Sequence, residues 1–483
     1  MNKHRPHVIV LFGAAGDLAR RKLLPGLLHL SSLGLLRDFE VVGTALEPLT
    51  VDEFRDLARQ ACERFAHGSV NPEAIEAFVR RLSYVDHAAG AEALAVAVAE
   101  AKERLGGDAD VLHYLSVPPS AAAEVVETIE RAGLAGGAKV VLEKPFGTDL
   151  ASARKLNDTI HRVFDEDQIF RIDHFLGKEA ALNILALRFA NGLFEPIWNR
   201  NHIDHVQIEV PEELGLEQRA SFYEQTGAFR DMVVTHLFQV LAFVAMEPPT
   251  ELTPYAISIE KDKVFRSLRP IDPSQVVRGQ YEGYRSEAGV DPNSQTETMV
   301  ALRCEVDNWR WSGVPFYLRT GKRLAEAGRI ISIAFREPPK SMFPASSGVG
   351  EYGPDHLTFD LDEASRLSLS FYGKRPGPGM ALEKLSMQFS IAEMEQAGGV
   401  LEAYERLILD AIHGDATLFT TSEGIERLWE VATPLLDDPP PVVSYAQGSW
   451  GPDQVHDVIA PHRWRLPFER PWREAKATVR VAG

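Results

Sequence analysis

The stretch V-I-V-L-F-G-A-A-G-D (Val8–Asp17) decides the fold. Val8 to Phe12 is a continuous apolar run, as expected for a strand that is buried on both faces of a sheet. The turn Gly13-Ala-Ala-Gly16 follows, and a helical pattern begins at Leu18. This succession is typical of a dinucleotide-binding unit, because glycines let the backbone approach a pyrophosphate at a helix N-terminus. The usual fingerprint has three glycines, so a simple tight turn is the alternative.

Strands and helices alternate from this turn to about residue 180. A capping box, Thr50 with Glu53, opens one of the helices. The remaining expected strands are 39–45, 111–117, 138–142 and 168–173, and the expected helices are 18–36, 50–65, 89–105 and 149–163. This alternation predicts an α/β fold with a Rossmann-like, doubly wound parallel sheet.

The end of the second strand bears on the choice of cofactor. An acid at this place binds the free 2′-hydroxyl of the adenosine ribose, whereas an Arg accepts a 2′-phosphate. The sequence has Leu46 and Glu47 there and no Arg, which favours NAD. An exposed loop Glu is the alternative, and Arg20 and Arg21 of the first helix could still reach a 2′-phosphate.

A second stretch, Q-I-F-R-I-D-H-F-L-G-K-E (Gln168–Glu179), places three chemically useful groups where a strand ends and a helix begins. Ligands of α/β proteins bind at this end of strands. If the segment coils early, His174 and Lys178 share a face and make a phosphate seat. Asp173 precedes them. A solvated turn with a surface ion pair is the alternative.

The pattern changes after about residue 182, where polar and apolar residues tend to alternate along the strands. This predicts a larger α+β domain with a mainly antiparallel sheet covered by helices. The expected strands are 205–210, 308–318, 330–336, 356–361, 367–372 and 385–389, and the expected helices are 227–246, 403–412 and 422–436. We therefore expect a dinucleotide-binding domain at 1–180 and a substrate and dimerisation domain at 181–483.

The helix around His236 carries a candidate general base on an apolar frame. A lone His in such a helix is more often a core residue, and it gains a role only if a carboxylate orients it. Asp173 is the obvious candidate, because an Asp–His pair suits alcohol oxidation beside a nicotinamide. The segment Arg319-Thr-Gly-Lys322-Arg323 ends a strand with three cations. It could hold phosphate or sugar hydroxyls, or be a basic surface turn.

The bulk composition limits the class of partner. The 483 residues carry a formal net charge of −18, which argues against nucleic acid and anionic membranes. The two cysteines, Cys62 and Cys304, cannot form a disulfide framework or a cysteine-based zinc site. The N-terminal apolar run is too short to span a membrane. These features predict a cytoplasmic protein.

Eight stretches match one family, and the match covers nearly the whole chain. They are G-A-A-G-D-L-A-R-R-K (from Gly13), Y-L-S-V-P-P (from Tyr114), E-K-P-F-G (from Glu143), R-I-D-H-F-L-G-K-E (from Arg171), L-R-F-A-N-G-L-F-E-P-I-W-N-R (from Leu187), G-A-F-R-D-M-V-V-T-H (from Gly227), P-F-Y-L-R-T-G-K-R-L (from Pro315) and Y-E-R-L-I-L-D-A-I-H-G-D (from Tyr404). The chain resembles glucose-6-phosphate 1-dehydrogenase.

The resemblance implies a set of site residues. His236 corresponds to the general base of the family, and Asp173 to its orienting carboxylate. The residues implied at the sugar or its phosphate are Lys22, Lys144, His174, Lys178, Glu212, Asp231 and Lys322. Those expected at the dinucleotide are Gly13, Gly16, Asp17, Leu18, Glu47, Pro118 and Lys144.

The resemblance also implies a reaction, a cofactor and an assembly. Hydride would pass from C1 of glucose 6-phosphate to NADP or NAD, giving a 6-phosphogluconolactone in the first oxidative step of the pentose phosphate pathway. A homodimer formed across the large sheet, or a homotetramer, is expected. The alternatives are a paralogue that oxidises another sugar or sugar phosphate, and a nucleotide-binding regulatory protein without catalysis.

Several positions depart from the family pattern. Phe175 replaces a Tyr near the phosphate, and Thr235 replaces an Asn before the base. Ala327 replaces a second phosphate-binding cation, although Arg329 is close by, and Leu46 replaces the Arg of the 2′-phosphate. A Q-P-x-E-G stretch near Leu369 is missing, and the segment 373–379 is short. These departures bear on the identity of the sugar substrate and on the choice of cofactor more than on the type of reaction.

Overall fold

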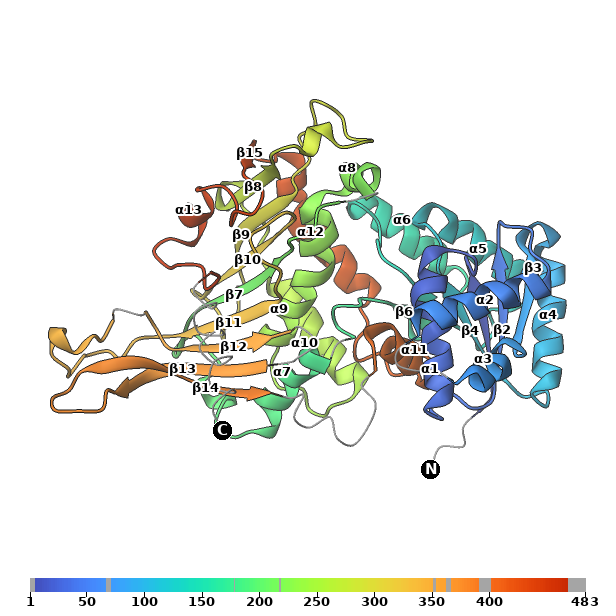
Figure 1. The fold of residues 1–483 in the computed structure, drawn as a ribbon, viewed down its shortest axis with the longest axis horizontal. Coiled ribbons are helices and arrows are strands. Elements are labelled where there is room, and N and C mark those ends of the chain that lie inside the picture. The colour runs from blue at the N-terminus through green and yellow to red at the C-terminus, as the bar shows by residue number, and fades with distance from the viewer. Residues whose placement is uncertain are drawn as a thin grey trace. The chain divides into compact units, whose positions relative to one another are not determined.

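The protein is described here by a computed structural model, which covers residues 5–66, 71–177, 179–216, 219–350, 353–361, 366–390 and 401–467. Contacts divide the chain into two compact units (Figure 1). Unit 1 comprises Met1–Lys178, Pro249–Ile259 and Gly399–Glu426, and unit 2 comprises Glu179–Pro248, Glu260–Gly398 and Arg427–Gly483. The units are discontinuous in sequence, whereas the predicted domains were continuous, and the predicted division at residue 180 stays a prediction.

Unit 1 is built on a six-stranded parallel sheet with the order β3-β2-β1-β4-β5-β6. This is the order of dinucleotide-binding Rossmann sheets. Its strands are β1 (His7–Phe12), β2 (Phe39–Ala45), β3 (Leu82–Asp86), β4 (Asp110–Leu115), β5 (Lys139–Leu142) and β6 (Ile169–Arg171). All six residues of β1 are buried, because β1 is central and helices pack on its sheet. The predicted doubly wound parallel sheet is confirmed.

The helices of unit 1 alternate with these strands (Figure 1). The helix after the glycine turn starts with a π-helical segment, and the predicted capping box of Thr50 and Glu53 is present on α2. The helices are η1 (Ala19–Leu23), α1 (Leu24–Ser32), α2 (Val51–Phe65), α3 (Pro72–Val79), α4 (Gly90–Arg104), α5 (Pro119–Arg131), α6 (Leu150–His161) and α11 (Ala403–His413). The last of these, α11, belongs to this unit although it lies far along the chain.

Unit 2 contains a nine-stranded sheet with the order β14-β13-β12-β11-β7-β10-β9-β8-β15. Its strands are β7 (Ile203–Pro211), β8 (Val276–Tyr281), β9 (Met299–Glu305), β10 (Pro315–Gly321), β11 (Ile330–Phe335), β12 (His356–Asp360), β13 (Arg366–Lys374), β14 (Leu382–Ser390) and β15 (Val442–Tyr445). Two pairs, β7–β10 and β8–β15, are parallel and the other six are antiparallel. The predicted mainly antiparallel sheet is confirmed.

The helices of unit 2 include one continuous apolar run from Ala220 to Ala245. It consists of α8 (Ala220–Ala228), the π-helical segment η6 (Phe229–Leu237) and α9 (Phe238–Ala245). Among the described residues this run alone has the length and composition of a membrane span, and 83% of its most apolar window is buried. Such burial is typical of the core helix of a globular domain. The helix α7 (Glu179–Ala190) packs against α9.

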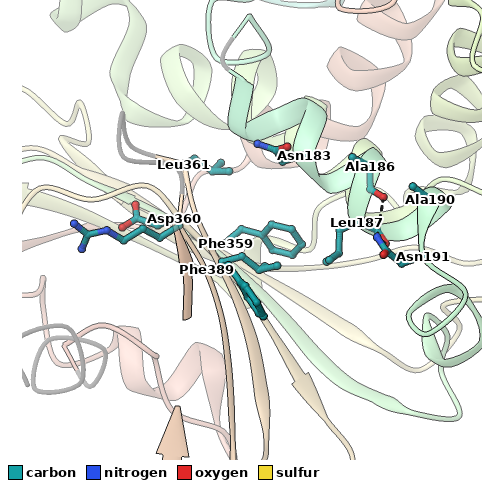
Figure 2. A pocket seen from close by; sticks show the side chains of 11 residues that line it. Asn183, Ala186, Leu187, Ala190, Asn191, Phe359, Asp360, Leu361 and Phe389 are labelled. Carbon is teal, nitrogen blue, oxygen red and sulfur yellow. Dashed lines mark hydrogen bonds between the residues drawn. The ribbon is translucent and has the colours of Figure 1, made fainter. Parts of the chain in front are cut away.

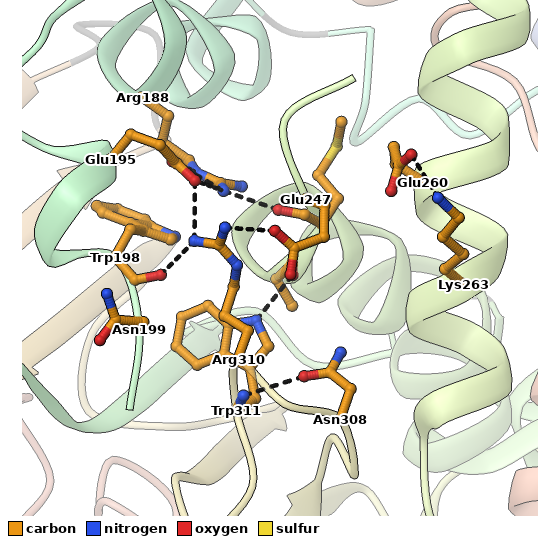
Figure 3. A network of polar contacts seen from close by, with 12 residues as sticks. Arg188, Glu195, Trp198, Asn199, Glu247, Glu260, Lys263, Asn308, Arg310 and Trp311 are labelled. Atoms are coloured by element: carbon orange, nitrogen blue, oxygen red, sulfur yellow. Dashed lines mark hydrogen bonds and ion pairs between the residues drawn. The ribbon is translucent and has the colours of Figure 1, made fainter. Parts of the chain in front are cut away.

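An ion-pair network joins α7 to the segments that contain Glu195, Glu247 and Arg310 (Figure 3). The Arg188 guanidinium is fully buried, lies 3.1 Å from Glu195, and donates to the Met246 carbonyl at 2.7 Å. Arg310 pairs with Glu195 at 2.8 Å and also with Glu247. Removing one member would leave a buried charge uncompensated, so the network fixes how these loops meet.

Two predicted boundaries need correction, and some elements were not expected. The strand expected at 308–318 begins only at Pro315, because Asn308 Oδ1 accepts the backbone N–H of Trp311 and forms a turn. Strand β3 and helix α3 were not expected, and neither were β8, β9 and β15. The helix expected at 18–36 ends at Ser32.

Candidate functional site

The glycine turn lies at the carboxyl end of β1. Gly13 has φ of +73°, and a Cβ there would lie 2.1 Å from the Ser116 carbonyl oxygen, so only glycine fits. Its N–H donates to the Thr44 carbonyl at 2.9 Å, and the Gly16 N–H donates back to Gly13 at 2.9 Å. These bonds hold the turn between the ends of β2 and β4, in front of η1. The arrangement fits the pyrophosphate of a dinucleotide.

The predicted ribose position lies at the end of the neighbouring strand β2. The side chain of Leu46 is 82% exposed, and Glu47 is exposed as well. Arg21 is engaged by Asp17, with 2.7 Å between Nε and Oδ1. Arg20 is exposed, and its side chain has no polar partner among the described residues. A cation is therefore present on the first helix, although β2 ends without one.

Pro118, at the end of the loop after β4, is exposed. The next strand, β5, ends at Leu142 and is followed by Glu143 and Lys144. The Tyr114 hydroxyl donates to Glu143 at 2.5 Å. Burial raises the pKa of the Glu143 carboxyl to about 7, against the lowering effects of Tyr114 and Lys144. The bond from Lys144 to Pro145 is cis. Lys144 is half-buried, and it lies at the same sheet edge as the glycine turn.

The catalytic candidates of unit 1 follow β6. Asp173 is 3% exposed, and its Oδ1 accepts the Phe175 N–H at 2.9 Å, which closes a tight turn. His174 is half-buried and stacks on Tyr404 of α11, with ring centroids 6.0 Å apart and planes 6° apart. A Cβ on Gly177 would lie 2.7 Å from the Ala403 carbonyl oxygen, so glycine allows α11 to pack on this turn. Lys178 lies outside the described residues.

The N-terminal end of α11 also holds the first helical segment. Lys22 of η1 pairs with Glu402 at 3.0 Å. His29 of α1 pairs through Nδ1 with Glu405 at 2.9 Å. The predicted substrate contact Lys22 therefore has a carboxylate partner within unit 1.

In unit 2 the predicted base, His236, lies in η6 and is 1% exposed. Asp231 and Thr235 belong to the same segment, and the Thr235 hydroxyl donates to the Asp231 carbonyl oxygen at 2.6 Å. Single π-helical segments are uncommon and often occur at functional sites. Asp231 and His236 therefore come from one segment, and the roles expected for them stay predictions.

A glycine and a distant carboxylate fix the start of η6. Gly227 has φ of +68°, and a Cβ there would lie 2.5 Å from Glu297 Oε1. The same oxygen accepts the N–H of Phe229 at 3.0 Å. Arg278 balances the Glu297 charge at 2.7 Å. This positioning contact was not foreseen, because no sequence signal connects Glu297 to a helix that begins about 70 residues earlier.

Glu212 and Lys322 follow the parallel pair β7 and β10. Pro211 and Gly321 are register partners, so the residues that follow them emerge side by side, and they form an ion pair. η6 packs against β10, which brings this pair to the same side of unit 2 as the His236 segment. The pair offers a cation and a carboxylate to a polyhydroxylated ligand.

Arg319, one of the three cations in the segment that could hold phosphate or sugar hydroxyls, does not lie at the surface. Arg319 is fully buried, pairs with Glu209, donates to the Leu466 carbonyl at 3.0 Å and lies 4.5 Å from the centroid of the Trp464 ring. It therefore stabilises the core and is not presented to a ligand. Arg323, by contrast, is exposed, with a positive φ of 51°.

Unit 2 also contains a cluster of Asp204, His205 and His462, whose possible metal-ligand atoms lie within 4.8 Å of one another. Gln207 Oε1 accepts the Arg465 N–H at 2.7 Å, so its Nε2 faces His205 Nε2 as a donor at 2.9 Å. His205 then carries its proton on Nδ1, which lies 2.9 Å from Asp204. A metal ligand needs a lone pair on that nitrogen, so this geometry favours a hydrogen-bond network over a metal site.

The parallel sheet of unit 1, with its strand order and the glycine turn, defines a Rossmann-type dinucleotide-binding domain joined to an α+β domain. Two family models match the chain. "Glucose-6-phosphate dehydrogenase, NAD binding domain" matches residues 10–183, and "Glucose-6-phosphate dehydrogenase, C-terminal domain" matches 185–472. The chain belongs to the glucose-6-phosphate dehydrogenase family, and it is an oxidoreductase of that family.

Curated relatives agree along the whole length. Glucose-6-phosphate 1-dehydrogenase of Rhizobium meliloti (strain 1021) is 42% identical over 94% of this chain and 96% of the relative. Glucose-6-phosphate 1-dehydrogenase 1 of Mycobacterium tuberculosis (strain ATCC 25618 / H37Rv) is 37% identical over 95% of this chain and 96% of the relative. These names do not favour the two alternatives, a paralogue with another substrate and a regulatory protein without catalysis.

Solved structures show the same fold. The crystal structure of glucose-6-phosphate 1-dehydrogenase from Mycobacterium avium has a TM-score of 0.86 at 37% identity, covering 96% of this chain and 99% of that one. A glucose-6-phosphate dehydrogenase in complex with glucose 6-phosphate has a TM-score of 0.89 at 29% identity, with the same coverage of both chains. The recognition made from the eight stretches is confirmed.

Proposed function

We propose that the protein oxidises glucose 6-phosphate at C1 and produces a 6-phosphogluconolactone, the first oxidative step of the pentose phosphate pathway. The observation that carries this proposal is the retained pair of segments, the Asp173–His174 turn after β6 and the His236 segment η6, in a chain that matches the family throughout. A nicotinamide dinucleotide, when bound, supplies the hydride acceptor.

We assign the proton chemistry to His236. Its neutral imidazole takes the C1 hydroxyl proton as hydride leaves the same carbon, so the carbon becomes a lactone carbonyl. Asp173 is assigned to orient the imidazole and to stabilise its charged form. Burial of both side chains supports this assignment, because a carboxylate and an imidazole interact more strongly away from water.

We assign sugar and phosphate binding to polar groups that are now held by protein partners. Glu212 and Lys322 form an ion pair, Asp231 lies on η6, and Lys22 pairs with Glu402. His174 and Lys178 are assigned to the phosphate and Lys144 to the sugar. A sugar phosphate would exchange these pairs for its own hydroxyls and oxygens.

The cofactor preference belongs to this proposal as well. We propose that NAD is used as well as or instead of NADP, with Glu47 at the ribose, because the strand end presents an exposed Leu46 where an Arg would bind a 2′-phosphate. NADP is the expectation from the family, and the exposed Arg20 could serve it. Leu46→Arg should raise the ratio of kcat/KM for NADP to that for NAD by about tenfold or more.

Leu193→Arg is the matched control for that variant, because Leu193 is 67% exposed and lies in unit 2. It should leave the ratio unchanged. If Leu46→Arg left it unchanged too, the 2′-phosphate would lie elsewhere, and Arg20 would become the residue to replace.

A substrate panel tests the sugar. We would measure kcat/KM for glucose 6-phosphate, other hexose phosphates and free glucose, and identify the product by NMR. The proposal expects the highest kcat/KM with glucose 6-phosphate and a lactone product. A higher value with another sugar would identify a paralogue, and departures such as Phe175 and Ala327 would then be the residues to replace.

We propose that the assembly is a homodimer, with a homotetramer as the alternative. One face of β13 and β14 carries three cross-strand apolar pairs, Leu367–Phe389, Leu369–Met387 and Phe371–Leu385. The exposed fractions of Leu385, Met387 and Phe389 are 45%, 48% and 57%. A contiguous apolar face of this kind supports an interface with a second copy.

An apolar pocket of about 250 Å³ adjoins this face, between α7 and the ends of β12 to β14 (Figure 2). Leu187 of α7, Phe359 of β12 and Phe389 of β14 line it. The apolar surface therefore continues from the strands to the helix.

We also propose a cytoplasmic location, which the reduced, buried Cys62 and Cys304 support.

A further inference from the structure

Unit 1 has a cavity of about 690 Å³ at the amino-terminal edge of its sheet. His7 begins β1, Asp110 begins β4 and Lys139 begins β5, and all three line the cavity. The glycine turn and Lys144 lie at the other end of these parallel strands, so this cavity is separate from the dinucleotide edge. Its volume is within the range of small-molecule sites.

The cavity is locally basic although the chain is strongly acidic. Arg5, Arg37 and Lys139 line it together with two carboxylates, Asp38 and Asp110. Two imidazoles, of His7 and His413, add further nitrogen groups. With a formal charge of −18 over the whole chain, a concave surface with more cations than acids is a local exception.

The cations keep hydrogen-bond donors for a ligand. Lys139 Nζ donates to the Ile412 carbonyl oxygen at 2.7 Å, which leaves two further N–H groups. Arg37 donates through Nε to the Gly34 carbonyl at 3.0 Å, and its two terminal nitrogens have no partner among the residues that the structure describes. Arg5 makes only a long, exposed contact of 3.4 Å with Asp110.

Part of the cavity wall is apolar. Leu35, Leu36 and Ile412 line it, and the side chain of Leu35 is 38% exposed. Several N–H donors beside an apolar wall suit a small phosphorylated molecule that has an apolar part, such as a nucleotide. We propose that this cavity is a second anion site, which binds the phosphate groups of a nucleotide or of inorganic pyrophosphate.

Isothermal titration of the full-length protein tests the proposal with two probes, ATP and inorganic pyrophosphate. The wild-type protein should show a binding event that Arg37→Met combined with Lys139→Met weakens at least tenfold. Loss with both probes would assign recognition to the phosphates alone. If the wild type binds ATP but not pyrophosphate, and the double variant weakens the binding of ATP, part of the recognition belongs to the apolar wall. Either result supports the site.

Two controls separate this cavity from the dinucleotide edge and from misfolding. Lys155→Met removes an exposed lysine of α6 and should leave both isotherms unchanged. Arg37→Met alone should still weaken binding. This substitution removes only one side-chain hydrogen bond, the one from Arg37 to the Gly34 carbonyl oxygen. The KM for the dinucleotide should be that of the wild type in each variant. Equal affinity in the wild type and the double variant, or no binding of either probe, would overturn the proposal.

Discussion

The residues assigned to chemistry are individually held by other parts of their own unit. Asp173 accepts the backbone N–H of Phe175, and Glu212 forms an ion pair with Lys322. His236 lies in a π-helical segment whose start is fixed by Glu297. Groups held in this way enter the reaction with little further ordering, which is a general source of catalytic rate.

A buried histidine away from the site gives a prediction about acid stability. His113 is fully buried in β4, and burial lowers the pKa of its imidazole from 6.5 to about 4. The fold therefore favours the neutral ring, and the stability present above pH 6.5 is lost as the pH falls toward 4. Between pH 7.5 and 5 the free energy of unfolding should fall by about 2 kcal/mol from this group alone.

Urea unfolding at both pH values checks this prediction. His113→Leu should show a smaller loss between pH 7.5 and 5 than the wild type. His202→Leu, at an exposed histidine, should show the loss of the wild type. Equal pH dependence in His113→Leu and the wild type would refute the assignment.

At the scale of elements, local signals predicted local structure well. The capping box at Thr50 and the glycine turn after β1 both formed as expected, because each depends on residues within a few positions. The predicted start of β10 was wrong, because the alternation of apolar and polar residues continues through a turn that the Asn308 side chain closes. The burial of Arg319 was not foreseen, because its partner, Glu209, lies 110 positions away and only the fold reveals the pair.

The candidate site shows the same difference between local signals, which the sequence reveals, and tertiary contacts, which it does not. The identities of Asp173, His174 and His236 were available from short motifs. The residues that position them were not, because Tyr404 and Glu297 reach the site through tertiary packing alone.

The start of η6 gives a prediction at this scale. Gly227→Ala places a Cβ against the Glu297 carboxylate and forces an L-residue into a positive φ. We expect a loss of about 1–3 kcal/mol in the free energy of unfolding. The kcat should also fall, because the segment that carries His236 would start from a displaced residue.

Gly192→Ala is the matched control, since a Cβ at Gly192 would meet no atom within 4 Å. Thermal unfolding and steady-state kinetics should leave it close to the wild type. Gly227→Ala with an unchanged melting temperature and kcat would show that the Glu297 contact does not position η6.

At the scale of the whole molecule, segments far apart in sequence complete each unit. The described residues of 401–426 contribute α11 to unit 1, where Tyr404 stacks on His174. On the apolar face of β13 and β14 in unit 2, the side chain of Met387 is 48% exposed. Both features depend on tertiary structure, and neither follows from any single motif.

The dimer proposal predicts the effect of a charge on that face. Met387→Glu places a carboxylate among the three apolar pairs, and burying it would cost several kcal/mol. Sedimentation velocity should therefore show monomers for this variant and dimers for the wild type. Met342→Glu, at a methionine that is 88% exposed, should leave the dimer intact. A wild-type monomer would contradict the proposal, and a wild-type tetramer would add a second interface.

The most direct test of the central claim is the initial rate of reduced-nicotinamide formation from glucose 6-phosphate, measured with NAD and with NADP for the wild type and His236→Asn. The account predicts wild-type turnover with at least one dinucleotide and a fall in kcat of about 10²–10⁴-fold in the variant. The KM for the dinucleotide should change little, because His236 is assigned to the sugar. No turnover by the wild type, or equal kcat in the two proteins, would contradict the account.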